Sequence, residues 1–211
     1  MNAVIVGHSF VRRLQRDTCP GLHGNISCAS LGGLLARSLQ VDKHYYCVYT
    51  YCDHINFISD LNTFTSFIRV NNISPDIVVL DIGSNDLAKL KAFNRNACLN
   101  LAGEVFDICQ TILSSTSTKC VVVKSVLPRT ARIQSSPQTF SNNLDLYNHC
   151  IKQFCDTEPR INYIKTKGFY QHLVTTWSND GIHCNKTSAQ RYKIRLRHSL
   201  LYNSYPASCN Y

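Results

Sequence analysis

Short runs of apolar, mostly β-branched residues alternate along this chain with longer segments of helical periodicity. The two clearest runs, DIVVLDIG at 76–83 and KCVVVKSVLP at 119–128, have an uninterrupted apolar centre instead of alternating apolar and polar positions. Strands with this pattern are covered on both faces, as in a parallel sheet flanked by helices. The pattern therefore limits the chain to α/β architectures.

Three further apolar runs followed by turn residues extend this order, at 3–7, 26–30 and 161–165. Apolar residues at helical spacing occupy the intervals at 55–68, 99–113, 140–154 and 187–201. Strands that alternate with helices form right-handed crossovers. We therefore predict an α/β fold, a three-layer α/β/α sandwich whose central parallel sheet has about five strands. The segment 41–51 is open to two interpretations, an additional strand or a packed loop.

Length and composition indicate one soluble domain. The 211 residues can bury a substantial core and contain no stretch that resembles an interdomain linker. We expect a single domain over 1–211, with a core of about 3–200 and a short C-terminal tail. The apolar runs are too short to cross a bilayer. The first of them, AVIV, has no Lys or Arg before it and lacks the length of a secretory signal, so we expect a cytoplasmic or nuclear protein.

Eleven cysteines are scattered through the chain without a CxxC pair, and several lie in apolar stretches. This usage is typical of small buried residues in a reducing compartment. A zinc site is the alternative, because Cys47, Cys52 and His54 lie close together in the sequence. Their spacing does not match the usual finger or ribbon patterns, and we expect no metal or organic cofactor.

The chain is basic, with 22 Lys and Arg against 13 Asp and Glu and a net charge of +9. Such a charge attracts polyanions through a long-range, salt-sensitive field, so weak association with nucleic acid or anionic lipid is expected. The densest basic group, Arg191 to Arg197, fits one solvated helix face as well as a nucleic-acid site.

Unusual polar residues follow two predicted strands and precede the last predicted helix. They are GHS at 7–9, GSND at 83–86 and DGIH at 180–183. In a parallel sheet the carboxyl ends of the strands meet at one edge, which is where such folds bind ligands. We therefore expect the three segments to lie close together.

Each segment offers one part of an acyl-transfer site and also has a simpler interpretation. Ser9, on a strand-to-helix turn, is either a nucleophile whose own N–H faces a developing oxyanion or a helix N-cap. Asp180 and His183, three residues apart, are either an oriented general base or an exposed loop pair. The Asn85 amide could donate to an oxyanion while Gly83 allows a close backbone approach; otherwise this segment is a polar turn.

Taken together and in this order, the segments resemble the sequence blocks of the SGNH hydrolases, also called GDSL-type esterases and lipases. The matching segments are GHS at 7–9, LGG at 31–33, DIGSND at 81–86 and DGIHCN at 180–185. The resemblance runs from residue 3 to about residue 200. It implies a flavodoxin-like SGNH hydrolase fold.

The resemblance also implies a role for each matching residue. Ser9 would be the nucleophile, His183 the general base and then the general acid, and Asp180 the residue that orients His183. The amides of Ser9 and Gly33 and the side chain of Asn85 would form the oxyanion hole.

Several neighbours of these residues would support the site. Gly32 could replace Gly33 as the oxyanion donor, because adjacent glycines leave the register open. Gly7 and Gly83 would permit the sharp turns. His8 departs from the family pattern, which usually has aspartate there, and could place a second imidazole beside the nucleophile.

A finer resemblance links the segment GHSFVRRL and the Cys-rich, basic composition to esterase domains of some LINE-type retrotransposon proteins. The function that the sequence predicts is a serine esterase that hydrolyses small or short-chain acyl esters through an acyl-enzyme intermediate. One alternative is a catalytically weak or inactive module that binds nucleic acid or a protein through its basic surface. A carbohydrate deacetylase of the same fold is another.

Overall fold

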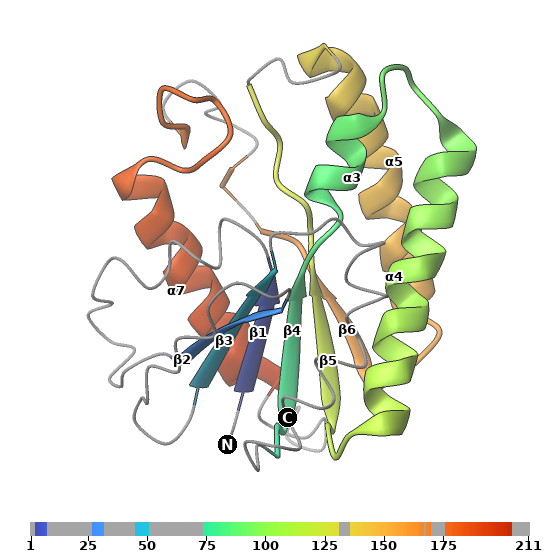
Figure 1. Cartoon of the computed structure of the whole chain (residues 1–211), viewed down its shortest axis with the longest axis vertical. Helices are drawn as coiled ribbons and strands as arrows, with labels where there is room; N and C mark the ends of the chain where they lie inside the picture. Colours follow the sequence, from blue (N-terminus) through green and yellow to red (C-terminus); the bar gives the residue numbers. More distant parts are fainter. Residues whose placement is uncertain are drawn as a thin grey trace, which may run out of the picture.

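The computed structural model describes one parallel sheet with helices on both of its faces (Figure 1). The residues that it describes are 3–7, 27–31, 45–50, 74–130, 136–166, 168–169 and 176–203.

Six parallel strands form the sheet, in the order β2-β3-β1-β4-β5-β6. Their bounds are Ala3–Gly7 for β1, Ser27–Leu31 for β2, Tyr45–Thr50 for β3, Ile77–Asp81 for β4, Cys120–Lys124 for β5 and Ile161–Ile164 for β6. The described residues thus contain six strands of the sheet, where about five were predicted. The additional strand is β3, in the segment whose interpretation was open, and its sequence YYCVYT is rich in residues that favour strands.

Four helices are described: α3 at Ser84–Lys89, α4 at Arg95–Ser115, α5 at Pro137–Cys155 and α7 at Lys186–Asn203. The periodic segments predicted at 99–113, 140–154 and 187–201 lie within α4, α5 and α7. The predicted helix at 55–68 lies outside the described residues. Sequence periodicity did not predict α3, because a helix of six residues is too short to display a repeated apolar face.

The core consists of two apolar clusters, one on each face of the sheet. Val78 and Leu80 of β4 pack into the cluster that contains the buried faces of α4 and α5. Val79, between them, belongs to the opposite cluster together with Tyr192 and Leu196 of α7. Figure 1 shows α4 and α5 on one side of the sheet and α7 on the other. Both faces of β4 are therefore covered, which confirms the predicted three-layer sandwich and explains the uninterrupted apolar sequence.

Strand β1 lies inside the sheet, between β3 and β4. The chain runs from β1 to β2 and β3 on one side of it and then crosses to β4 on the other. The carboxyl ends of β1 and β4 thus flank the point where the strand order reverses, and open α/β sheets bind their ligands outside this point. Among the described residues, no helix is long and apolar enough to span a membrane.

Candidate active site

The segment GHS at 7–9, the first of the three predicted for the site, begins beside the point where the strand order reverses. Gly7, the last residue of β1, is paired with Tyr49 on one side and with Asp81, the last residue of β4, on the other. His8 and Ser9 follow Gly7 in the sequence and lie outside the described residues, as do Gly32 and Gly33. Their predicted roles therefore stay predictions.

Asp180 and His183 are in direct contact. Nδ1 of His183 lies 2.6 Å from Oδ2 of Asp180. The other carboxylate oxygen, Oδ1, accepts hydrogen bonds of 2.9 Å from the backbone N–H groups of His183 and Ile182. Asp180 is thus bound to both the backbone and the ring of His183, so the imidazole presents its second nitrogen, Nε2, away from the carboxylate. Of the two interpretations that the spacing left open, the contact is the one expected for an oriented imidazole.

A tight loop holds this pair. Trp177 and Cys184 form an antiparallel bridge at its base, and the N–H of Ser178 donates to the carbonyl of His183 at 2.7 Å. Gly181 has a φ of 62°, in the left-handed region that glycine adopts readily. The hydroxyl of Ser178 donates to Oδ1 of Asp180 at 2.8 Å. The loop therefore fixes the carboxylate from several directions.

These hydrogen bonds keep Asp180 ionised. Partial desolvation acts to raise the pKa of its carboxyl, but the hydrogen bonds from His183, Ile182 and Ser178 outweigh it and hold the pKa well below the ordinary value. Asp180 is therefore an anion across the neutral and moderately acid range, as the stabiliser of a positively charged imidazole must be.

The GSND segment forms a sharp turn into α3. Gly83 has a φ of 96°, and its carbonyl accepts the first helical hydrogen bond, from Leu87. A Cβ atom at Gly83 would lie 3.0 Å from the hydroxyl of Tyr147, a fully buried residue of α5. Both the backbone conformation and this close approach require glycine, and together they place Asn85 in the first turn of α3.

Arg129 is a functional candidate that the sequence did not single out. It lies in the segment after β5, is 6% exposed and donates to the hydroxyl of Ser84. It also donates to Oδ1 of Asn85, at 3.1 Å. Desolvation lowers its pKa to about 10, against the opposing effects of Asp81 and Asp180, so it stays protonated at neutral pH. One sequence signal could have indicated Arg129. It is a basic residue that follows β5 closely, and the carboxyl end of β5 lies at the edge of the sheet where the site was predicted.

The segment after β5 also contacts the loop that carries His183. The N–H of Thr130 donates to the carbonyl of Gly181 at 2.9 Å, and the Thr130 hydroxyl lies 3.3 Å from the same oxygen. Residues 129 and 130 thus connect the Asn85 turn to the Asp180–His183 loop. The structure brings these two predicted segments together, as expected for one sheet edge.

A buried polar cluster adjoins the Asp180–His183 loop. The Tyr192 hydroxyl donates to the carboxylate of Asp81, and the Lys124 ammonium lies 3.3 Å from the centre of the Tyr192 ring. Lys124 is 1% exposed, and its ammonium has no hydrogen-bond partner among the described residues. Desolvation lowers its pKa to about 8, although the charge of Asp81 and the neighbouring Cys184 act to raise it.

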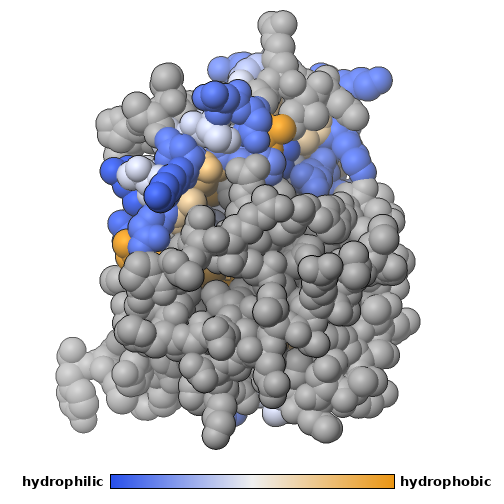
Figure 2. Space-filling model, turned by 60° about the vertical axis from the view of Figure 1, so that its left-hand side comes forward, coloured by the Kyte–Doolittle hydropathy of each residue, from blue (hydrophilic) through white to orange (hydrophobic). Residues whose placement is uncertain are grey.

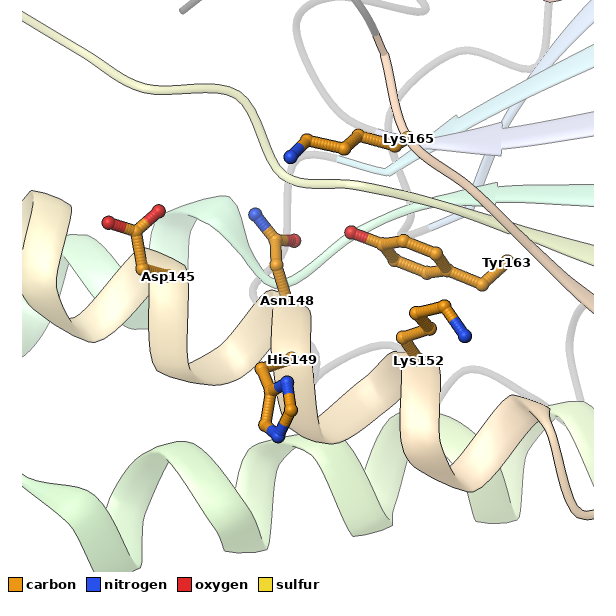
Figure 3. A pocket seen from close by; sticks show the side chains of 6 residues that line it. All are labelled: Asp145, Asn148, His149, Lys152, Tyr163 and Lys165. Atoms are coloured by element: carbon orange, nitrogen blue, oxygen red, sulfur yellow. The ribbon is translucent and has the colours of Figure 1, made fainter.

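A groove of about 360 Å³ lies elsewhere on the described surface, beside α5 and β6. Figure 3 shows the residues that line it: Asp145, Asn148, His149, Lys152, Tyr163 and Lys165. None of them belongs to a segment that the sequence predicted for the active site. Within the described ranges, no group of three or more His, Cys, Asp or Glu residues could hold a metal ion. Of the three zinc candidates, Cys47 lies on β3, while Cys52 and His54 are outside those ranges.

Solved structures share this fold. A protein from Bacteroides fragilis assigned as an acylhydrolase superposes with a TM-score of 0.64 at 15% identity, over 97% of this chain and 88% of that one. A GDSL-like lipase from Bacteroides thetaiotaomicron has a TM-score of 0.63 at 16% identity, over 96% and 88% of the two chains. The chain has the SGNH hydrolase fold.

A mutant acetyl esterase with an acetate ion also superposes, with a TM-score of 0.61 at 13% identity, over 96% of this chain and 98% of that one. No protein-family model matches the sequence, and no curated protein does. At these identities the likeness establishes the fold alone, and an activity depends on the residues at the edge of the sheet.

Proposed function

We propose that this protein is a serine esterase that hydrolyses small or short-chain acyl esters through an acyl-enzyme intermediate. The observation that carries the proposal is the contact of 2.6 Å between Nδ1 of His183 and the carboxylate of Asp180 at the carboxyl edge of the sheet. This contact sets the imidazole tautomer, so that Nε2 can accept a proton. The Asn85 turn at the same edge adds a hydrogen-bond donor for an oxyanion.

Ser9 supplies the nucleophile in this proposal. It is two residues along the chain from Gly7, a span of at most about 7 Å, so chain connectivity keeps it near the ends of β1 and β4. In the first step, Nε2 of His183 removes the hydroxyl proton of Ser9 while the Ser9 oxygen attacks the ester carbonyl carbon. The Asn85 amide and the N–H groups of Ser9 and Gly33 donate to the resulting oxyanion.

The second half of the reaction regenerates the enzyme. Collapse of the tetrahedral intermediate breaks the bond to the alcohol, which leaves with the proton held by His183. Water then attacks the acyl-Ser9 ester, with His183 again acting as base and then as acid, and the carboxylic acid departs. Asp180 remains an anion throughout and stabilises the imidazolium that forms in each half.

A preference for small substrates is part of this proposal. The strands point toward the upper end of the molecule in Figure 1. In the space-filling view the described residues at that end are mainly hydrophilic, with only small hydrophobic areas between them (Figure 2). A long acyl chain binds to extended apolar surface, whereas an acetyl-sized group does not need it.

Hydrolysis of p-nitrophenyl acetate and labelling by a fluorophosphonate probe test the proposal. The wild-type protein should hydrolyse the ester and be labelled, and Ser9→Ala should lose both properties. The matched control is Ser114→Ala, which removes an exposed serine of α4 and should retain both. Equal hydrolysis by wild type and Ser9→Ala would refute the assignment of the nucleophile.

A binding module without turnover is the second candidate. It is favoured by His8, which stands where the family usually has aspartate, and by the net charge of +9. A protein that is not labelled but retains nucleic acid at physiological salt would support the module over the esterase. The deacetylase activity and the finer resemblance to LINE-type esterase domains stay predictions.

A further inference from the structure

We infer that Arg129 is a positioning residue of the active site: it sets the direction of the Asn85 carboxamide so that the amide NH₂ faces the oxyanion. This inference rests on the proposed esterase function and deepens it. Arg129 belongs to none of the sequence blocks on which the SGNH resemblance depends.

The chemistry of the guanidinium determines which end of the carboxamide it contacts. All nitrogens of a guanidinium are donors and none is an acceptor. The Asn85 atom at 3.1 Å from the Arg129 nitrogen must therefore be the oxygen Oδ1, because an NH₂ group placed there would set two donors against each other. The Asn85 NH₂ is then directed away from Arg129. An asparagine without such a neighbour can turn its amide over and present the oxygen, which would repel an oxyanion.

The burial of Arg129 makes this direction rigid. Its side chain is 6% exposed, its guanidinium lies 5.5 Å from the centre of the Phe140 ring, and the hydroxyl of Ser84 accepts a second hydrogen bond. Positive charge beside Oδ1 also draws electron density from the amide and makes its N–H groups better donors. Donors that are fixed before the reaction stabilise a transition state without reorganisation during it.

The same segment fixes the Asn85 turn relative to the general base. Thr130, the next residue, holds the carbonyl of Gly181 through its backbone N–H at 2.9 Å. Gly181 lies between Asp180 and His183, so a two-residue segment contacts both halves of the site.

A double-mutant cycle between Arg129 and Asn85 tests the inference, with p-nitrophenyl acetate as substrate. Asn85→Ala removes the donor and should lower kcat by ~10²- to 10³-fold. Arg129→Met leaves the donor but frees its orientation, and should lower kcat by about 10- to 100-fold with little change in KM. In the double variant kcat should equal that of Asn85→Ala, because Arg129 then has no amide left to direct.

Two further variants complete the design. Arg160→Met removes an exposed arginine that pairs with Glu158 and should keep the wild-type kcat. Arg129→Lys preserves the positive charge but lacks the planar guanidinium with its fixed donors, so kcat should fall less than in Arg129→Met. This loss of kcat should also vanish when Asn85 is replaced by alanine. If circular dichroism shows that Arg129→Met does not fold, the double-mutant cycle of Arg129→Lys with Asn85→Ala tests the inference in its place.

The outcomes separate the two proposals. A wild-type protein that neither hydrolyses esters nor is labelled by the fluorophosphonate overturns the esterase function and the inference with it. If the wild type is active and the losses of kcat in the Arg129 and Asn85 single variants multiply in the double variant, the inference is overturned. The esterase function then still stands. Losses that do not multiply support a role of Arg129 exerted through Asn85.

Discussion

Replacement of Lys124 by methionine should stabilise the protein at neutral pH. Methionine has a similar length and flexibility and makes favourable contacts with aromatic rings, so it can occupy the space beside Tyr192. It carries no ammonium group, and the ammonium of Lys124 is buried without a hydrogen-bond partner among the described residues. The variant therefore removes a buried charge while it retains the packing.

The size of the effect follows from the lowered pKa. A lysine pKa that falls from 10.5 to about 8 on folding corresponds to a destabilisation of about 3 kcal/mol while the lysine is protonated in both states. The attraction of Asp81 is already included in that pKa. The cation–π contact with Tyr192 offsets about 1–2 kcal/mol of the cost. We therefore expect Lys124→Met to raise the free energy of unfolding by about 1–2 kcal/mol at pH 7.

The difference in the free energy of unfolding between the wild type and Lys124→Met should decrease as the pH rises. Below pH 8 both states hold the lysine proton, so the full cost is present. Between pH 8 and 10.5 the folded state loses the proton first, the unfolded state binds more protons, and the wild type gains stability relative to the variant. The stability gap between the two proteins should thus narrow by about 1–2 kcal/mol on going from pH 7 to pH 10.

Urea unfolding in the presence of a reductant measures this gap. The fluorescence of Trp177, the only tryptophan and 6% exposed, reports the transition. Lys119→Met removes an exposed lysine near the start of β5 and controls for the loss of one positive charge. A gap that stays constant or widens as the pH rises would refute the reasoning about Lys124.

Two further variants test the site and its turn. Asp180→Asn should lower kcat by ~10³- to 10⁴-fold in the p-nitrophenyl acetate assay, because the imidazole loses its orienting anion. An unchanged kcat in this variant would contradict the roles of Asp180 and His183. Gly83→Ala should cost about 1–3 kcal/mol, seen as a lower Tm, because φ is 96° and the new Cβ would meet Tyr147. Gly103→Ala, in open space within α4, is the control and should raise stability by about 0.5–1 kcal/mol; equal effects of the two glycine variants would contradict the proposed strain.

The sequence predicted those parts of the fold and site that depend on local pattern. The apolar centres of β4 and β5 and the periodicity of α4, α5 and α7 indicated the three layers. The spacing of Asp180 and His183 allowed their contact, and the SGNH resemblance implied it. Arg129 escaped prediction because its partners Ser84 and Asn85 lie 45 and 44 residues away, a proximity that only the crossover to β5 creates. The strand order had to come from the structure, because nothing local in YYCVYT indicates that β3 separates β2 from β1.

The interior position of β1 has a consequence for how the protein is made. Its first residue, Ala3, pairs with Tyr45 and Ile77, so both of its neighbours are synthesised long after it. Until β4 has left the ribosome, the apolar strand that leads to Ser9 has one edge without its native partner, and such edges are prone to aggregation. Sheets built from distant pairings also form slowly. The segment that leads to the proposed nucleophile is thus translated before both of the strands that pair with it, and it stays incompletely paired until they follow.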